Sequence, residues 1–136
     1  MFRSGLVLAG GNNAWRGEAL VPGKEDGILT AYAVAQMDLS NTDLAVLSAC
    51  ETALGDLRGN EGVFGLQRAF KMAGVKQLII SLWPVPDVET TAVMTLFYHN
   101  WLIGQSTREA LRNTQLQIRK KYPQKPYYWA GFVLVE

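Results

Sequence analysis

Short apolar runs alternate along this chain with longer segments in which apolar residues recur every three or four positions. Continuous short runs are typical of strands, whereas the three-to-four-residue spacing is typical of amphipathic helices. The expected strands are residues 4–9, 44–49, 75–82 and 127–135. The expected helices are residues 31–37, 61–73, 87–102 and 107–121. Alternation of the two kinds of element predicts an α/β fold with a mostly parallel sheet flanked by helices.

Several residues mark where the expected helices begin and stop. Thr30 and Asn60 stand where an N-cap belongs, because their short polar side chains can accept hydrogen bonds from first-turn N–H groups. Ser106 and Glu109 have the spacing of a capping box. Gly74 follows the 61–73 helix, at the place where glycine commonly adopts the left-handed conformation that ends a helix.

The composition limits the classes of protein to which the chain can belong. Its 136 residues suit a single domain, residues 1–136. The formal net charge of +1 provides no strong field, so neither nucleic acid nor an anionic membrane is expected as a partner. The sequence contains no apolar run of about eighteen residues, so no membrane span is expected. The single cysteine excludes an internal disulfide and favours a reducing compartment, the cytoplasm.

That cysteine, Cys50, follows the expected strand at 44–49, whose mostly apolar sequence predicts burial on both faces. Ligands of α/β sheets bind at the carboxyl ends of strands, and a nucleophilic cysteine there needs exposure, a lowered pKa and a nearby base. Backbone N–H groups of the following loop and helix would lower the pKa of the thiol, whereas Glu51 and Asp56 would raise it. A buried structural thiol is the alternative, and position alone leaves both open.

The only histidine, His99, is a poor candidate for the base that Cys50 would need. Each residue of a helix advances by about 100°, which places His99 opposite the apolar stripe of the 87–102 helix, facing solvent. One cysteine and one exposed histidine also cannot supply a tetrahedral metal site, so no metal or other cofactor is expected. The expected core face of that helix consists of Val93, Met94, Phe97, Tyr98 and Trp101.

The glycine-rich stretch from Gly55 to Gly62, between a strand and a helix, raises phosphate binding as an alternative. The stretch contains neither GxxxxGK[ST] nor GxGxxG, the two common phosphate-binding patterns. The carboxylates of Asp56 and Glu61 would repel a phosphate. Phosphate binding is therefore the weaker hypothesis for this loop.

Several stretches of the chain together resemble the CHAT domain, a caspase-like module often found after tetratricopeptide repeats. The sequence LSACETALG at 47–55 resembles the family's cysteine motif, and GNEGVFGLQRAFKMA at 59–73 resembles the helix that follows it. The segment SLWPVPD at 81–87 is similar to the family's Ser-Leu-Trp-x-Val-x-Asp stretch. Further similar segments are SGLVLAG at 4–10, FY at 97–98 and PYYWAGF at 126–132. The resemblance is ordered and covers essentially the whole chain.

The resemblance implies a caspase-like three-layer sandwich, in which helices flank a mostly parallel sheet. In the family the general base is a histidine of a His-Gly pair, upstream of the strand that residues 4–10 resemble. The chain is therefore expected to be the C-terminal part of a CHAT domain, incomplete at its N-terminal side, with the nucleophile and without the base. Loss of such a base typically lowers the rate by about 10²–10⁴-fold, so negligible peptidase turnover is expected from this chain as given.

The resemblance also implies roles for individual residues. Cys50 would attack the scissile carbonyl, and its backbone N–H would form part of the oxyanion hole. Ser81, Leu82 and Trp83 would form the edge of a groove that pairs with an extended substrate. Asp87 would hold a basic substrate side chain through its carboxylate. Alternatively, Asp87 caps the helix that follows, and Trp83 is a core or cover residue.

The partners implied are a protein or peptide substrate and an upstream tetratricopeptide-repeat region in the parent protein. The alternative function is a non-catalytic signalling or interaction module that binds peptides or partner proteins along residues 81–83. If the early strands of the sheet are absent, an uncovered edge would invite pairing with a second copy. A homodimer of the fragment is therefore expected.

Overall fold

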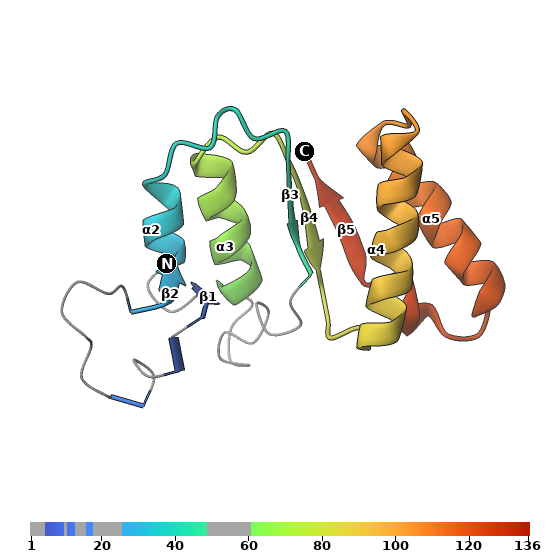
Figure 1. Cartoon of the computed structure of the whole chain (residues 1–136), viewed down its shortest axis with the longest axis horizontal. Coiled ribbons are helices and arrows are strands. Elements are labelled where there is room, and N and C mark those ends of the chain that lie inside the picture. The colour runs from blue at the N-terminus through green and yellow to red at the C-terminus, as the bar shows by residue number, and fades with distance from the viewer. Residues whose placement is uncertain (1–4, 10, 13–15, 18–25, 49–60) are drawn as a thin grey trace. The chain divides into compact units, whose positions relative to one another are not determined.

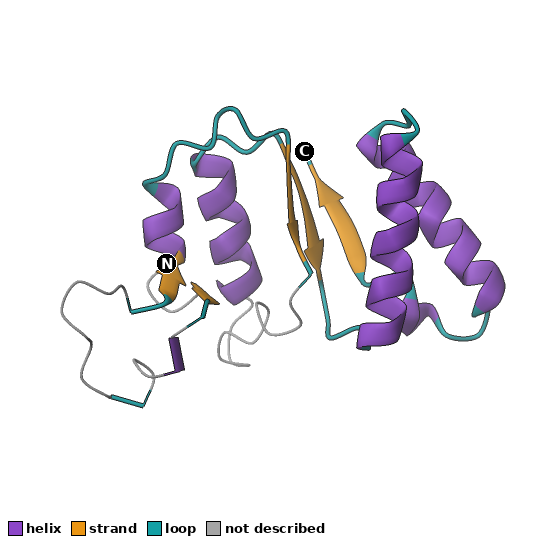
Figure 2. Cartoon of the chain, viewed as in Figure 1, coloured by secondary structure: helices purple, strands orange, loops and turns teal. Residues whose placement is uncertain are grey.

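The computed structural model of the chain divides into two compact units (Figure 1). Unit 1 comprises Met1–Leu44 and Thr52–Lys76, and unit 2 comprises Ala45–Glu51 and Gln77–Glu136. Both units contain helices and strands (Figure 2), which confirms the predicted α/β class. The structure describes residues 5–9, 11–12, 16–17, 26–48 and 61–136.

Unit 1 contains a small antiparallel sheet that the sequence predicts only in part. Strand β1 spans Gly5–Val7, inside the expected strand at 4–9, and pairs with strand β2 over Ile28–Thr30. The register places Gly5 opposite Thr30. The sequence pattern does not predict β2, because three residues are too few to show an alternation of apolar and polar positions.

Two helices of unit 1 pack against each other through small and apolar side chains. Helix α2 spans Ala31–Ala35 and helix α3 spans Glu61–Met72, and the two lie side by side in Figure 1. The predicted cap of α2 is confirmed, since Thr30 Oγ1 accepts a hydrogen bond from the Ala33 N–H at 3.1 Å. Asn60, the predicted cap of α3, lies outside the described residues. The buried side chains of the two helices are Ala31, Val34, Leu66, Ala69 and Phe70.

Gly74 ends α3 as predicted, with a φ of +100° that side chains disfavour. The turn at 38–43 also approaches it closely, because a Cβ at this position would lie 2.9 Å from the Ser40 Cα. In the same turn, Ser40 donates hydrogen bonds from its hydroxyl and its N–H to Asp38 Oδ1, at 2.6 and 3.1 Å. These hydrogen bonds lower the pKa of Asp38 below its ordinary value, and the bond from the Ser40 hydroxyl has the larger effect.

Unit 2 contains a three-stranded sheet in the order β3-β4-β5. The strands span Leu44–Leu47 (β3), Gln77–Ser81 (β4) and Phe132–Val135 (β5). Strand β5 is antiparallel to β4, with Ser81 opposite Phe132, whereas β3 and β4 run in the same direction in Figure 1. The sheet is therefore mixed, and the mostly parallel caspase-like sandwich stays a prediction.

The strands of unit 2 differ in burial according to their place in the sheet. Strand β3 pairs with β4 alone in the described sheet, and all of its residues are only half-buried. The expectation that β3 buries both faces is therefore wrong for the described residues. Strand β5 begins later than expected, because Pro126–Tyr128 form a 3-10 turn that starts with a proline. The buried residues of the central strand β4 are Leu78, Ile79, Ile80 and Ser81.

Helices α4 and α5 of unit 2 form a packed pair. Helix α4 spans Asp87–Leu102 and helix α5 spans Thr107–Lys121, both as predicted. Tyr98 is exposed, so its predicted place in the core face of α4 is wrong. The buried stripe of α4 runs through positions 93, 97 and 100, and Tyr98 lies at its margin. Among the described residues no helix is both long and apolar enough to cross a membrane. The buried side chains of the pair include Val93, Phe97, Ala110, Leu111 and Ile118.

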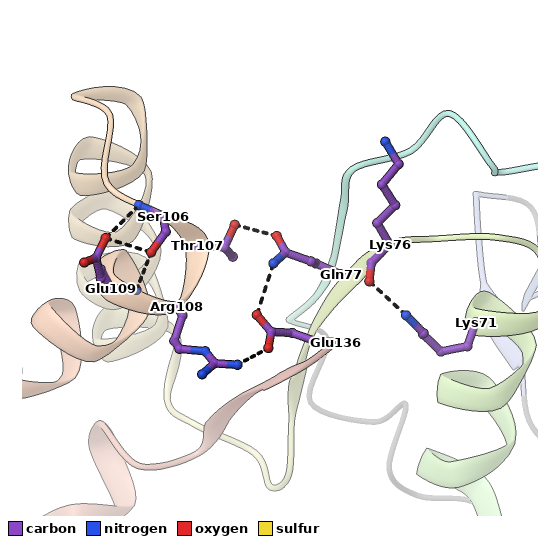
Figure 3. A network of polar contacts seen from close by, with 8 residues as sticks. All are labelled: Lys71, Lys76, Gln77, Ser106, Thr107, Arg108, Glu109 and Glu136. Atoms are coloured by element: carbon purple, nitrogen blue, oxygen red, sulfur yellow. Dashed lines mark hydrogen bonds and ion pairs between the residues drawn. The ribbon is translucent and has the colours of Figure 1, made fainter.

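The first turn of α5 is fixed by the predicted capping box and by contacts with the sheet (Figure 3). Ser106 Oγ accepts a hydrogen bond from the Glu109 N–H at 3.3 Å, and the Glu109 carboxylate accepts from the Ser106 hydroxyl and N–H at 2.7 and 3.2 Å. Thr107 Oγ1 donates to Gln77 Oε1 at 2.7 Å, and Gln77 donates to the Glu136 carboxylate at 3.3 Å. The start of α5 is thereby joined to the first residue of β4 and to the end of the chain.

Candidate functional site

The candidate site combines two chain segments that follow neighbouring strands of unit 2. The first follows β3, which ends at Leu47, and leads to Cys50. Cys50 itself lies outside the described residues, as does most of the glycine-rich stretch at 55–62. The second segment follows β4 and is described throughout, from Ser81 to Asp87.

Ser81, the last residue of β4, is buried and holds the turn that follows it. Its Oγ donates a hydrogen bond to the Trp83 carbonyl oxygen at 2.5 Å. Its backbone lies opposite Phe132 in the ladder with β5. Ser81 is 3% exposed, so its side chain supports the turn from inside the fold.

Leu82 carries the pairing with the C-terminal part of the chain one residue beyond β4. Its N–H donates to the Gly131 carbonyl oxygen at 2.8 Å. Leu82 is 44% exposed, although this hydrogen bond fixes its backbone. Leu82 is therefore the apolar side chain that this segment presents at the surface.

Trp83 is held by the 3-10 turn in two ways and is neither a core residue nor a loose surface residue. Its indole Nε1 donates to the Tyr127 carbonyl oxygen at 2.9 Å. Its ring stacks on the Tyr127 ring, with centroids 5.7 Å apart and an interplanar angle of 23°. Both contacts fix the rotamer of a half-buried tryptophan whose donor is satisfied.

Gly131 completes this arrangement, and the sequence analysis did not single it out. A Cβ at Gly131 would lie 2.7 Å from Val85 Cγ2 and 3.0 Å from Trp83 Nε1. Val85 is itself buried, at 1% exposure, so it has little room to retreat. The sequence does contain a signal for this role. Gly131 lies inside the expected strand at 127–135, and a glycine within a strand often marks a place that another segment approaches closely.

Asp87 is the first residue of α4 and is exposed. The N-cap of the helix is Pro86, and no side chain forms a cap hydrogen bond there, so the interpretation of Asp87 as the N-cap is wrong. The first turn of α4 is closed by a backbone hydrogen bond instead, in which the Thr90 N–H donates to the Pro86 carbonyl at 2.8 Å. An acidic side chain in the first turn interacts favourably with the helix dipole, and its exposed carboxylate can receive a basic side chain.

His99 lies on the outer face of α4, as the helical spacing predicts. Its side chain is exposed, and its backbone carbonyl accepts a hydrogen bond from the Ile103 N–H at 3.2 Å. The exposed ring stands one position before the buried Asn100 and two after the buried Phe97.

Among the described residues, the carboxyl groups with lowered pKa values are those of Asp38 and Glu109, which belong to the turn at 38–43 and to the cap of α5.

The 81–87 segment can therefore act as a rigid ledge. The backbone around Leu82 and Trp83 is fixed by the hydrogen bonds to Gly131 and Ser81, and the indole is fixed by Tyr127. The ledge presents an apolar leucine and, at its end, a carboxylate. Such a surface suits an extended peptide with one basic side chain.

Comparisons with known proteins relate the chain to one family. The family model of the CHAT domain matches residues 2–136. Tetratricopeptide repeat protein 28 of Homo sapiens is 31% identical over 115 residues, which cover 84% of this chain and 5% of that protein. Its counterpart in Mus musculus is 32% identical over 109 residues, which cover 79% of this chain and 4% of that protein. The chain thus spans only a small share of the length of these relatives.

Proposed function

The chain belongs to the CHAT domain family, and from this membership we propose that it carries the cysteine half of a caspase-like peptidase site. In this proposal Cys50 is the nucleophile, and the ledge at 81–87 binds the substrate. The observation that carries the proposal is the direction of two strands. Because β3 and β4 are neighbours and run in the same direction (Figure 1), the segments that follow them leave the sheet at the same edge.

The chemistry proposed for Cys50 is attack of the thiolate on the scissile carbonyl of a protein or peptide. The C–S bond forms as the carbonyl oxygen gains charge, and the C–N bond then breaks as the leaving amine takes a proton from the histidine of the family's His-Gly pair. Water would then hydrolyse the thioester, which releases the new carboxylic acid and restores the Cys50 thiol. The Cys50 N–H would donate to the oxyanion together with an N–H of the family's His-Gly pair. We further propose the family's three-layer sandwich as the fold that assembles these groups.

The proposed site also needs a general base to accept a proton, and His99 does not serve as that base. That histidine is the only one in the sequence and is exposed on α4. We therefore expect negligible peptidase turnover from the chain as given, because loss of a general base typically lowers rates by about 10²–10⁴-fold. Fluorogenic peptides with Arg or Lys before the scissile bond would measure that turnover.

Substrate binding would use strand addition along Ser81–Trp83. The Leu82 N–H already donates to Gly131, and the Trp83 carbonyl already accepts from Ser81. A substrate backbone must therefore bond the other polar groups of this segment, and its side chains would rest on Leu82. Asp87 would pair with a basic substrate side chain, as an exposed carboxylate at the helix start.

The experiment that tests the catalytic proposal is the rate of Cys50 alkylation by iodoacetamide as a function of pH. A preformed thiolate site should react with an apparent pKa well below about 8.5 in the folded chain and with an ordinary pKa in urea. Mass spectrometry reports the adduct, and Cys50→Ser is the blank. Reaction only in urea would identify a buried structural thiol and would overturn the proposal.

The second candidate function is a non-catalytic interaction module. The fixed ledge favours it, because Trp83 and Leu82 are held by contacts that need no catalytic partner. The relatives named after tetratricopeptide repeats suggest a parent protein with a repeat region, and peptides or partner proteins would bind along 81–83. Equal peptide affinity of the native chain and Cys50→Ser, with no turnover in the parent protein, would support this function.

A homodimer of the chain is also proposed. Several apolar side chains are strongly exposed, among them Leu102 at 77% and Ile103 at 64%. Exposed apolar surface of this kind commonly pairs with another chain. Light scattering coupled to size-exclusion chromatography would report the mass, and a monomer at millimolar concentration would contradict the proposal.

A further inference from the structure

The C-terminal end of α5 and the turn after it carry positive charge with no neighbouring acid in the sequence. From residue 110 to residue 135 there is no aspartate or glutamate. The cations of that stretch are Arg112, Arg119, Lys120, Lys121 and Lys125, and all of them are exposed. A chain with a net charge of only +1 thus concentrates cations at one place.

Three of these cations lie over aromatic rings, in what we name the basic-aromatic cluster. Arg119 Cζ is 5.7 Å from the centre of the Trp129 ring. The remaining two pairs of the cluster are Lys121 over Tyr122, at 5.3 Å, and Lys125 over Tyr128, at 5.2 Å. Distances of this size are those of cation–π contacts, which place a cation without neutralising it.

The rings of the cluster are themselves fixed. Trp129 Nε1 donates to the Tyr122 carbonyl oxygen at 3.3 Å, and the Tyr122 and Tyr128 rings meet edge to face with centroids 5.3 Å apart. The Tyr128 N–H also donates to the Lys125 carbonyl at 3.1 Å, within the 3-10 turn. The cluster is therefore a preorganised set of positive charges and not a set of loose surface side chains.

The cations of the cluster also differ from other cations of the chain in what pairs with them. Lys76 pairs with Asp43, and Arg108 pairs with Glu136. Within the described ranges, none of the three cations of the cluster forms an ion pair with a carboxylate. The α5 dipole favours cations in its last turn, but Lys125 lies beyond that helix, where this explanation does not apply.

We propose that the basic-aromatic cluster is a docking surface for an acidic peptide segment of a partner protein. Charge complementarity carries the proposal, because fixed and unpaired cations attract carboxylates and select for them over neutral sequences. A single-stranded nucleic acid fits less well, because bases need open ring faces. The rings here already have cations over them or meet each other edge to face.

The cluster adjoins the ledge described above, since Tyr127 lies in the same turn and stacks on Trp83. An acidic segment bound to the cluster would therefore lie beside residues 81–87. The docking surface nevertheless does not depend on Cys50 or on catalysis. It goes beyond the proposed function, and its test leaves the cysteine untouched.

The test is fluorescence anisotropy with a fluorescein-labelled peptide of alternating Glu and Gly, in about 50 mM salt and again in about 300 mM salt. The native chain should bind the Glu peptide saturably and should not bind the matching Gln peptide. Lys121→Gln/Lys125→Gln should weaken binding about fivefold. Arg16→Gln/Arg68→Gln changes the net charge equally at exposed residues outside the cluster and should leave the affinity unchanged.

Three results would overturn the proposal. The first is absence of saturable binding of the Glu peptide at low salt. The second is an equal loss of affinity in the two double variants, which would indicate a general effect of net charge. The third is tighter binding of a labelled single-stranded oligonucleotide than of the Glu peptide. Circular dichroism of both variants shows that the fold is kept.

Discussion

At the scale of single residues, Gly131 determines how the ledge is built. Its missing side chain lets the Trp83 indole and the Val85 side chain approach the backbone that precedes β5. Its carbonyl oxygen accepts the Leu82 N–H at the same place. One glycine thus serves both the pairing of the segments and the packing of the indole, and both functions require close approach.

We predict that Gly131→Ala destabilises the chain by about 1–3 kcal/mol, because the new methyl group would overlap the side chains of Val85 and Trp83. Urea unfolding followed by circular dichroism measures the change. Val85→Ala removes the methyl group in closest contact, so the double variant should lose less stability than the sum of the single variants. Additive losses would show that the overlap is not the cause.

Individual residues also show where sequence patterns stop being informative. His99 could be placed on the exposed face of α4, because helical spacing alone fixes its direction. The spacing did not place Tyr98 correctly, since the buried stripe of α4 also includes the polar Asn100. A pattern of apolar residues cannot predict that a buried asparagine has a partner on another helix.

At the scale of elements, that partner joins α4 to α5. Asn100 Nδ2 donates to Thr114 Oγ1 at 3.1 Å, and both residues are buried, at 5% and 0% exposure. The hydrogen bond lies among apolar contacts of the helix pair, where water cannot replace it. It therefore contributes to the stability of the helix pair.

We predict that Thr114→Val costs about 1–3 kcal/mol, because it leaves the buried amide of Asn100 without an acceptor for its N–H group. The substitution nearly preserves volume, so the cost reflects the hydrogen bond. Asn100→Leu with Thr114→Val should cost less than the sum of the single changes, as a double-mutant cycle by urea unfolding will show. A native midpoint in Thr114→Val would contradict this account.

The capping box of α5 predicts a pH dependence with a definite sign. Hydrogen bonds from Ser106 lower the pKa of Glu109 in the folded chain, so the ionised carboxylate stabilises the fold. This contribution is complete above the unfolded pKa of roughly 4.3 and is lost as the pH falls through the lower, folded pKa. We predict that Glu109→Gln unfolds at a lower urea concentration than the native chain at pH 6, and that the difference disappears in strong acid.

The pKa of Asp38 is also lowered in the folded chain, so Asp38 adds a pH dependence of the same sign. The stability of the native chain must therefore be compared with that of Glu109→Gln at each pH. The Asp38 contribution is the same in both and cancels. Ser106→Ala, which removes the donor hydroxyl and keeps the Ser106 N–H, should reduce the pH-dependent difference without abolishing it. A difference that grows on acidification would have the wrong sign for a lowered pKa.

The elements could be predicted from sequence wherever local signals agree. The bounds of α4 and α5 agree with a helical period, and the start of α5 agrees with a capping box. Strand β2 and the late start of β5 could not be found in this way. The first is too short to show a period, and the second follows a 3-10 turn at Pro126–Tyr128 that the apolar pattern of residues 127–135 does not indicate.

At the scale of the whole molecule, the family motifs predicted more than the local pattern did. The segments 81–87 and 126–132 lie far apart in the chain and meet through the Trp83–Tyr127 and Leu82–Gly131 contacts. The spacing of apolar residues carries no information on such a contact. The resemblance to a family identified both segments as motifs without predicting that they meet. The mixed direction of the sheet was likewise beyond a pattern that predicts strands without their pairing.

The two units are expected to differ in resistance to local opening. Among the residues that the structure describes, most of the largest fully buried side chains belong to unit 2, including Phe97, Phe132 and Leu78, whereas α2 of unit 1 has only five residues. Opening a region with fewer buried apolar contacts costs less free energy. We predict that hydrogen exchange, resolved by mass spectrometry of peptides, is slowest in α4, β4 and β5 and distinctly faster in α2 and the β1–β2 sheet.

The substitution Phe97→Ala tests whether this protection belongs to unit 2 itself. Removing a fully buried phenylalanine typically costs about 3–5 kcal/mol, and Phe97 is buried within the α4–α5 pair. If unit 2 opens on its own, the variant should exchange faster in α4, β4 and β5 and unchanged in α2 and α3. Equal acceleration of exchange in both units would mean that the units open together. The difference in protection could then not be explained by the difference between their cores.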